Sequence, residues 1–193
     1  MVHLPAFLDE GPAPVARPAG DPPRLLTVGM MRPGDKLESY RRLAAGLAHL
    51  PGEWRLDVIG DGEAAGAVRA LFARFGDRVA FRGRVDDPAG LRAAYEAADL
   101  MVWPGVGEGV GMAVLEAQAA GLPVVSEDHP AQRDLIEGPL VPPDDPAAFA
   151  RAVGAALAER AARGAAARAR IEARHGLDAA AAILRRELVG LVR

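Results

Sequence analysis

Short, mainly apolar runs that end at a glycine or a turn recur along this chain and alternate with stretches of helical spacing. The runs lie at 24–29, 54–60, 78–83, 99–104 and 122–127, with a further short one near 138–141. Between the first two, Leu37, Tyr40 and Leu43 recur three positions apart, as on a helix with one apolar face. Strands that are apolar throughout must be covered on both faces, so the pattern predicts a parallel sheet between two helical layers. We therefore expect an α/β fold with a doubly wound, Rossmann-like sheet of about six strands.

The first 23 residues differ from the rest of the chain. They carry six prolines and show no periodicity, so we expect residues 1–23 to form a linker or extended arm. Composition alone leaves an interdomain linker and an ordinary frayed terminus equally open. Residues 24–193 are expected to form the folded domain, in which 146–193 is helical in two segments, 146–176 and 177–192.

Composition excludes several classes of protein. The formal net charge is −3 and no basic run exceeds two residues, so no nucleic-acid partner is expected. The chain has no cysteine, and its four histidines are scattered, so we expect neither a disulfide scaffold nor a metal site. No apolar stretch is long enough to cross a membrane, and residues 1–23 show no basic region followed by an apolar core. These features favour a globular, cytoplasmic domain.

The stretch WPGVGEGVGMAVLEAQAAGLPVV, at 103–125, contains the loop with the most chemistry. In doubly wound sheets, ligands bind beyond the carboxyl ends of the strands, so the loop at 104–111 faces the expected site. Its glycines bring backbone N–H groups close to a ligand, and the helix that follows favours anions at its first turn. A phosphate or a group of sugar hydroxyls would suit this loop.

The glycine spacing argues against two familiar phosphate-binding motifs. Gly105, Gly107 and Gly111 give G-x-G-x-x-x-G, one residue longer than the dinucleotide fingerprint. No Gly-Lys-Ser/Thr follows, which excludes a P-loop. Glu127 does follow the next strand, roughly where a ribose-binding acid would fall, so a nicotinamide dinucleotide site remains an alternative.

Charged residues around the loop suggest recognition of a polyol and a phosphate. Glu108 lies at the start of a helix, where its charge is stabilised, whereas Glu116 lies further along and could equally face solvent. Two acids without a metal-binding pattern favour sugar hydroxyls over a cation. After the first strand, Arg32 and Lys36 could neutralise a diphosphate, and Arg84 is a candidate for a base or phosphate pocket.

Residues 98–125, ADLMVWPGVGEGVGMAVLEAQAAGLPVV, resemble the signature of glycosyltransferase family 4, the group 1 glycosyltransferases of GT-B fold. LLTVG, LDVIGDGE and VAFRGRV occur upstream in the order that this family shows. The resemblance covers about 24–190 and corresponds to the C-terminal, donor-binding half of those enzymes.

The resemblance implies a role for each candidate residue. Glu108 would contact the hydroxyls of the donor sugar, and Glu116 the ribose of the nucleotide. The sugar and diphosphate would be held by backbone amides around Gly109, Val110, Gly111 and Met112.

The loop after the first strand would supply cations to the leaving diphosphate. Gly29 would border the donor, and Lys36 matches the lysine of the family. The family's arginine, expected beside Gly29, is Met30 here, so Arg32 is the candidate to replace it. Near the base pocket, the resemblance leaves Arg84 as a further candidate.

The family resemblance also implies an activity. We expect a bacterial hexosyltransferase that transfers a sugar from a nucleoside diphosphate donor to an acceptor with retention, and that needs no cofactor or metal. The acceptor site would belong to an N-terminal domain missing from this chain, and any membrane association would depend on that domain. Alone, the chain should bind the donor weakly and transfer little. The alternatives are half of a GT-B sugar-nucleotide epimerase and a non-catalytic nucleotide- or NAD-binding module.

Overall fold

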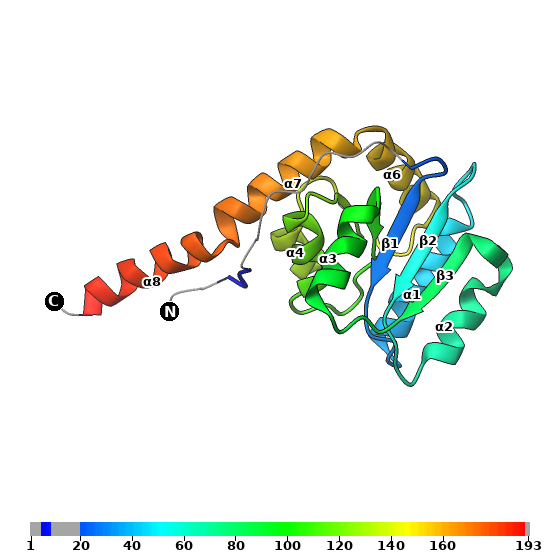
Figure 1. Cartoon of the computed structure of the whole chain (residues 1–193), viewed down its shortest axis with the longest axis horizontal. Coiled ribbons are helices and arrows are strands. Elements are labelled where there is room, and N and C mark those ends of the chain that lie inside the picture. Colours follow the sequence, from blue (N-terminus) through cyan, green and yellow to red (C-terminus); the bar gives the residue numbers. More distant parts are fainter. Residues whose placement is uncertain (1–4, 9–19, 192–193) are drawn as a thin grey trace.

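A computed structural model of the chain describes residues 5–8 and 20–191 (Figure 1). Its centre is a sheet of five parallel strands in the order β3-β2-β1-β4-β5. The strands are β1 (Arg24–Val28), β2 (Arg55–Ile59), β3 (Val79–Gly83), β4 (Leu100–Val102) and β5 (Val124–Val125). Both sides of β1 are paired, since it lies between β2 and β4. The predicted α/β class and parallel sheet are confirmed.

Helices cover both faces of the sheet. The helices are α1 (Asp35–Leu47), α2 (Ala65–Phe72), α3 (Pro88–Ala97), α4 (Met112–Ala119), α5 (Pro130–Leu135), α6 (Pro146–Ala158), α7 (Arg160–Arg174) and α8 (Leu177–Leu191), with a 3₁₀ turn, η1 (Ala73–Arg78), after α2. On one face α1 packs against α2 and α6, and on the other α4 packs against α3 and α7. None of the helices within the described ranges combines the length and the apolar character needed to cross a membrane.

Local sequence accounts for where several helices begin. Asp87 precedes α3, and its carboxylate accepts hydrogen bonds from the N–H groups of Ala89 and Gly90 at 3.1 and 3.0 Å. Asp145 caps α6 in the same way through the N–H of Ala148 at 2.8 Å. In both helices a proline stands in the first turn, where its missing N–H costs nothing.

The predicted sixth strand near 138–141 is wrong. Val141 makes an isolated parallel bridge to Glu127, and the sheet itself ends at β5. Pro139, Pro142 and Pro143 surround Val141 and cannot donate backbone hydrogen bonds, so a longer ladder cannot form there.

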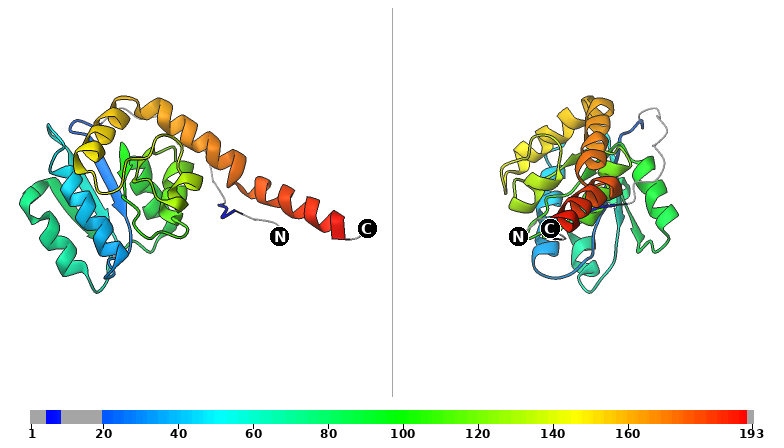
Figure 2. Two further views of the ribbon diagram at one scale, coloured as in Figure 1. Left: turned by 180° about the vertical axis from the view of Figure 1, so that it is seen from behind. Right: turned by 90° about the vertical axis from the view of Figure 1, so that its left-hand side faces the viewer.

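Part of the predicted arm at 1–23 contacts the C-terminal helices. The N–H of Leu8 donates to the carbonyl of His175 at 2.8 Å, and Nδ1 of His175 lies 2.8 Å from the carbonyl of Ala6. Residues 1–4 and 9–19 of the arm lie outside the described ranges. Figure 1 and Figure 2 show α8 projecting away from the sheet.

A network of charges ties α1 to the loop after β5. Glu127 is almost fully buried, and its carboxylate pairs with Arg42 at 2.9 Å and with His129 at 3.1 Å. Arg42 also bonds Glu38 on its own helix at 2.8 Å. The buried charge of Glu127 is therefore compensated by partners within the protein, and its role is structural.

The carboxylate of Glu38 predicts a pH-dependent contribution to stability. Hydrogen bonds from Arg41 and then Arg42 lower the pKa of Glu38 to about 2. This stabilisation is complete above the ordinary glutamate pKa of about 4.3 and is lost as the pH falls toward 2. Solvent screens the partly exposed partners, so we expect a contribution of about 1 kcal/mol.

Urea unfolding of the Glu38→Gln variant, compared with the unaltered protein, checks this expectation. The difference in the free energy of unfolding should be constant at neutral pH and shrink below about pH 4.5. Glu63→Gln is the control, because Glu63 is exposed and has no ion-pair partner among the described residues. A difference for Glu38→Gln that persists unchanged at pH 2 would contradict the assignment.

Candidate functional site

A cleft of about 790 Å³ opens at the carboxyl ends of the central strands. The loops that follow β1, β2, β3 and β4 all contribute to its walls, as predicted for a sheet of this kind. The loop after β5 is not among the cleft-lining segments. The predicted residues that line the cleft are Gly29, Arg32, Lys36, Arg84, Glu108, Val110, Gly111 and Met112.

The floor of the cleft depends on two close backbone approaches. Gly60 has φ +136°, and a Cβ at this position would overlap the carbonyl of Gly29. A Cβ on Gly62 would overlap the carbonyl of Met31 in the same way. Backbone hydrogen bonds hold the two loops together; one of them runs from the N–H of Gly29 to the carbonyl of Ile59 at 3.0 Å. Only glycine allows the loops after β1 and β2 to lie this close.

Lys36 and Glu108 meet across the cleft. Nζ of Lys36 pairs with Oε1 of Glu108, and Nε1 of Trp103 donates to the same oxygen at 3.0 Å. Nζ of Lys36 also lies 5.3 Å from the ring centroid of Trp103. The Glu108 side chain is 9% exposed, so two donors compensate a largely buried carboxylate. Lys36 is the only lysine of the chain.

Unpaired backbone amides occur in the loop at the edge of the same cleft, which Val110, Gly111 and Ala113 line and Gly109 does not. The N–H groups of Gly109, Val110, Gly111 and Ala113 have no acceptor within the part of the chain that the structure describes. Gly111 precedes α4 without a side-chain cap, so these amides add to the positive end of the helix dipole. The N–H of Met112 is different, because it donates to the carbonyl of Val110 at 3.0 Å. Such an array of donors suits an anion.

Glu116 lies one turn further along α4 and contacts another helix. The hydroxyl of Tyr95, on α3, donates to Oε2 of Glu116 at 2.8 Å. Burial, and then the negative charge of Glu116, raise the pKa of Tyr95 far above its usual range, so Tyr95 remains a hydrogen-bond donor. Glu116 does not itself line the cleft. Its predicted contact with a ribose stays a prediction.

The candidate arginines differ in whether they already have an ion-pair partner. Arg32 lines the cleft and has no ion-pair partner among the described residues, whereas Arg84 pairs with Asp86 at the rim. Met30, which occupies the position of the expected arginine, is 54% exposed and also lines the cleft. The structure thus places Arg32, and not residue 30, as the available guanidinium.

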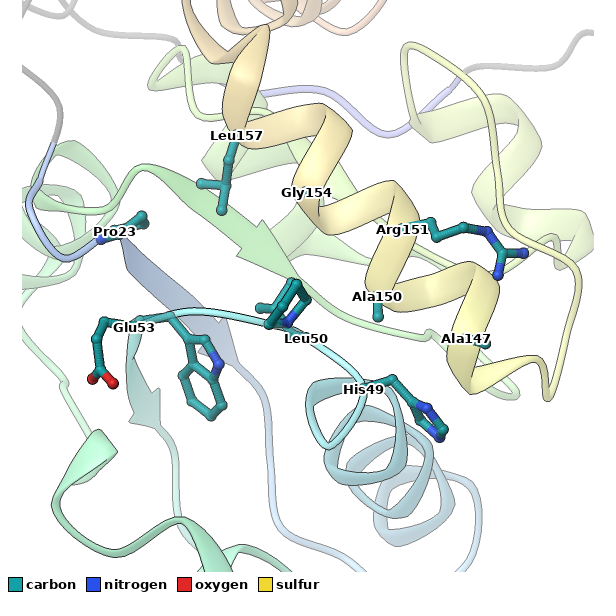
Figure 3. A pocket seen from close by; sticks show the side chains of 11 residues that line it. Pro23, His49, Leu50, Glu53, Ala147, Ala150, Arg151, Gly154 and Leu157 are labelled. Carbon is teal, nitrogen blue, oxygen red and sulfur yellow. The ribbon is translucent and has the colours of Figure 1, made fainter.

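A second hollow, of about 430 Å³, lies between the end of α1 and α6 (Figure 3). Apolar side chains such as Leu50 and Leu157 form much of its wall, and His49 and Arg151 stand at one side. It lies by Pro23, at the start of β1, away from the carboxyl ends of the strands. We therefore place the candidate site in the larger cleft.

Comparison with known protein families decides the classification. A family model described as glycosyl transferases group 1 matches residues 22–159, which is more than half of the chain. The chain belongs to the group 1 glycosyltransferases. The predicted family is confirmed.

Relatives of this group 1 glycosyltransferase chain include two curated enzymes. A D-inositol 3-phosphate glycosyltransferase of Xylanimonas cellulosilytica is 36% identical over 176 residues, which cover 85% of this chain and 41% of the relative. A phosphatidyl-myo-inositol mannosyltransferase of Mycobacterium leprae is 43% identical over 86 residues, covering 42% of this chain and 23% of the relative. The chain therefore spans less than half the length of these curated relatives.

Solved structures with the same fold are glycosyltransferases of the GT-B class. A sucrose-phosphate synthase from Thermosynechococcus elongatus has a TM-score of 0.80 and 29% identity, covering 98% of this chain and 52% of that one. A lipopolysaccharide outer core galactosyltransferase in its apo form has a TM-score of 0.81 and 23% identity, covering 98% of this chain and 55% of that one. This group 1 glycosyltransferase chain corresponds to about half of each.

Two side chains at the site of this group 1 glycosyltransferase were not predicted from the sequence. Trp103 donates to Glu108, and the only available signal was an aromatic residue at the end of a strand. Oγ of Ser39 accepts the N–H of Val106 at 3.0 Å and so ties α1 to the glycine-rich loop. Glu127, the acid considered for a dinucleotide, is buried in the charge network and does not line the cleft.

Proposed function

We propose that this chain binds a nucleoside diphosphate sugar in the cleft and, with a second domain, transfers a hexose to an acceptor with retention of configuration. The observation that carries the proposal is the meeting of three features in one cleft. Lys36 and Glu108 face each other there, beside the unpaired amides that precede α4. A diphosphate needs the cation and the amides, and a sugar needs the carboxylate.

The diphosphate would lie against the start of α4. The amides of Gly109, Val110 and Gly111 donate to its oxygens, and Lys36 and Arg32 balance its charge. When the bond between the sugar's anomeric carbon and the diphosphate oxygen breaks, its electron pair goes to that oxygen. The same cations and amides then stabilise the additional negative charge. The acceptor hydroxyl attacks the anomeric carbon on the face that the diphosphate leaves, and its proton passes to the departing diphosphate oxygen.

The two glutamates would bind the polyol parts of the donor. Glu108 accepts hydrogen bonds from sugar hydroxyls, for which it exchanges its present contact with Lys36. Glu116 lies four residues after Met112 and therefore on the same side of α4, where it would reach the ribose hydroxyls. The Tyr95 hydroxyl holds one oxygen of Glu116 and leaves the other for the ligand.

The proposal includes a second domain because the relatives are about twice as long as this chain or longer. That domain would supply the acceptor site, so the chain alone should bind the donor weakly and turn over little. Cytoplasmic location, a bacterial hexosyltransferase activity and independence of metals and cofactors also belong to the proposal. Against the NAD-binding alternative stands the burial of Glu127, which is already paired with Arg42.

The single lysine provides a direct test of the site. An amine-reactive acylating reagent can modify Lys36 and the N-terminal amine only, since the chain has no other lysine. We expect UDP or GDP to slow the acylation of Lys36, because the bound diphosphate contacts its amine and shields it from the reagent. Peptide mass spectrometry measures both amines, and the N-terminal amine is the internal control. Equal acylation of Lys36 with and without saturating UDP and GDP would contradict the proposal.

A further inference from the structure

Two glutamines are buried near the glycine-rich loop, and they differ in their hydrogen bonding. Gln118, on α4, donates to the carbonyls of Val114 (3.3 Å) and Leu135 (2.7 Å) and accepts the N–H of Glu137 at 3.1 Å. Gln132, on α5, is 0% exposed, and neither its Nε2 nor its Oε1 has a partner within the described ranges. Buried amides are nearly always paired, so the unpaired amide of Gln132 calls for an explanation.

The amide of Gln132 lies directly against the first glycine of the loop. A Cβ on Gly105 would overlap Nε2 of Gln132 and lie 3.0 Å from its Cδ. Gly105 has φ +80°, a conformation that favours glycine. The missing side chain at position 105 is therefore what allows the amide to face loop backbone.

The loop beside Gln132 is anchored at its two ends and at Val106, whose N–H donates to Oγ of Ser39 at 3.0 Å. At its start, the carbonyl of Pro104 accepts the hydroxyl of Ser126 at 3.0 Å, and at its end α4 begins. In the turn itself, the N–H of Glu108 reaches the carbonyl of Gly105 at 3.3 Å, a long hydrogen bond. The Gly105 backbone can therefore shift slightly between the anchors at Pro104 and Val106 without breaking a regular ladder.

We propose that Gln132 is a positioning residue for the glycine-rich loop. When a nucleoside diphosphate occupies the cleft, the turn at Gly105–Gly107 moves onto Gln132, whose amide then donates to a backbone carbonyl and accepts a backbone N–H. The free protein keeps a buried amide unpaired, and the bound protein pairs it, so the pairing favours the bound form. The proposal rests on the proposed function, which supplies the ligand.

Gln132→Met separates this role from simple filling of space. Methionine has a similar volume and no polar atoms, so the free protein should unfold at the same or a higher temperature than the unaltered protein. Affinity for UDP or GDP should fall about tenfold, because the bound loop loses its hydrogen bonds to the amide. If Gln132 only filled space, Gln132→Met would not combine an equal or higher unfolding temperature with a weaker affinity for UDP or GDP.

Gln118→Met is the matched control. The substitution removes three hydrogen bonds and leaves the carbonyl of Leu135 and the N–H of Glu137 without their partner. The unfolding temperature of this variant should therefore fall. Thermal unfolding and calorimetric titration with UDP and GDP measure both variants. If Gln132→Met binds with unchanged affinity, or loses stability as Gln118→Met does, the role of Gln132 is overturned alone. If the unaltered protein binds neither nucleotide, the proposed function is overturned as well.

Discussion

Replacing Lys36 with alanine should weaken binding of UDP or GDP by about 10- to 100-fold. A hydrogen bond to a charged group contributes about 1.5–3 kcal/mol, and the ammonium group of Lys36 is the cation nearest Glu108 in the cleft. Arg32 and the amides before α4 remain, so some binding should survive. Calorimetric titration measures the loss, and thermal unfolding checks that the fold is intact.

Glu108→Gln is the control for Lys36→Ala, because it breaks the same ion pair from the other side. Lys36 is then free for the diphosphate, so UDP or GDP alone should bind at least as tightly as to the unaltered protein. The affinity of Glu108→Gln for UDP-glucose or GDP-mannose should not rise in the same way, since a glutamine accepts fewer hydrogen bonds from the sugar hydroxyls than a glutamate does. Equal losses of diphosphate affinity in both variants would mean that the ion pair serves the fold and not the donor.

Gly60→Ala should destabilise the protein by about 3 kcal/mol or more. An alanine at φ +136° is strained, and its Cβ would overlap the carbonyl of Gly29. That carbonyl also accepts the hydroxyl of buried Tyr40 at 2.8 Å, so displacing it disturbs the core. The measurement is the free energy of unfolding in urea. The floor of the cleft moves with these residues, so nucleotide binding should also be lost.

Gly66→Ala is the matched control for Gly60→Ala. Gly66 lies in α2 with an ordinary helical φ, and nothing lies within 4 Å of the place of its Cβ. Alanine there should stabilise the protein by about 0.5–1 kcal/mol, because glycine has the lower helix propensity. If Gly60→Ala were as stable as Gly66→Ala, the close approach of the two loops would be contradicted.

The sheet could be predicted because its information is local. Runs such as LLTVG and LDVIG are mainly apolar and end at glycines, and β1 and β2 each begin one residue before them and end one residue before the glycine. The error at 138–141 has a local cause too, because GPLV is apolar enough for a strand while its prolines prevent a ladder. The helical segment predicted at 146–176 became two helices, α6 and α7, because nothing in its alanine-rich composition marks the break at Glu159, whereas the predicted break after Gly176 agrees with the start of α8.

The candidate site was predictable as a set of loops and much less as a set of contacts. Strand ends indicate which loops meet, so the positions of Arg32, Lys36 and Glu108 on one cleft followed from the order of elements. The pairing of Lys36 with Glu108 joins residues 72 positions apart, and no pattern in the sequence indicates it. The same holds for Tyr95 and Glu116, whose contact depends on how α3 packs against α4.

Calorimetric titration of the unaltered protein with UDP, GDP and NAD tests the central claim most directly. The amides before α4, Lys36 and Arg32 should give saturable binding of UDP or GDP, and NAD should not bind, because the acid considered for its ribose is buried in an ion-pair network. Binding of NAD without binding of UDP or GDP would contradict the account.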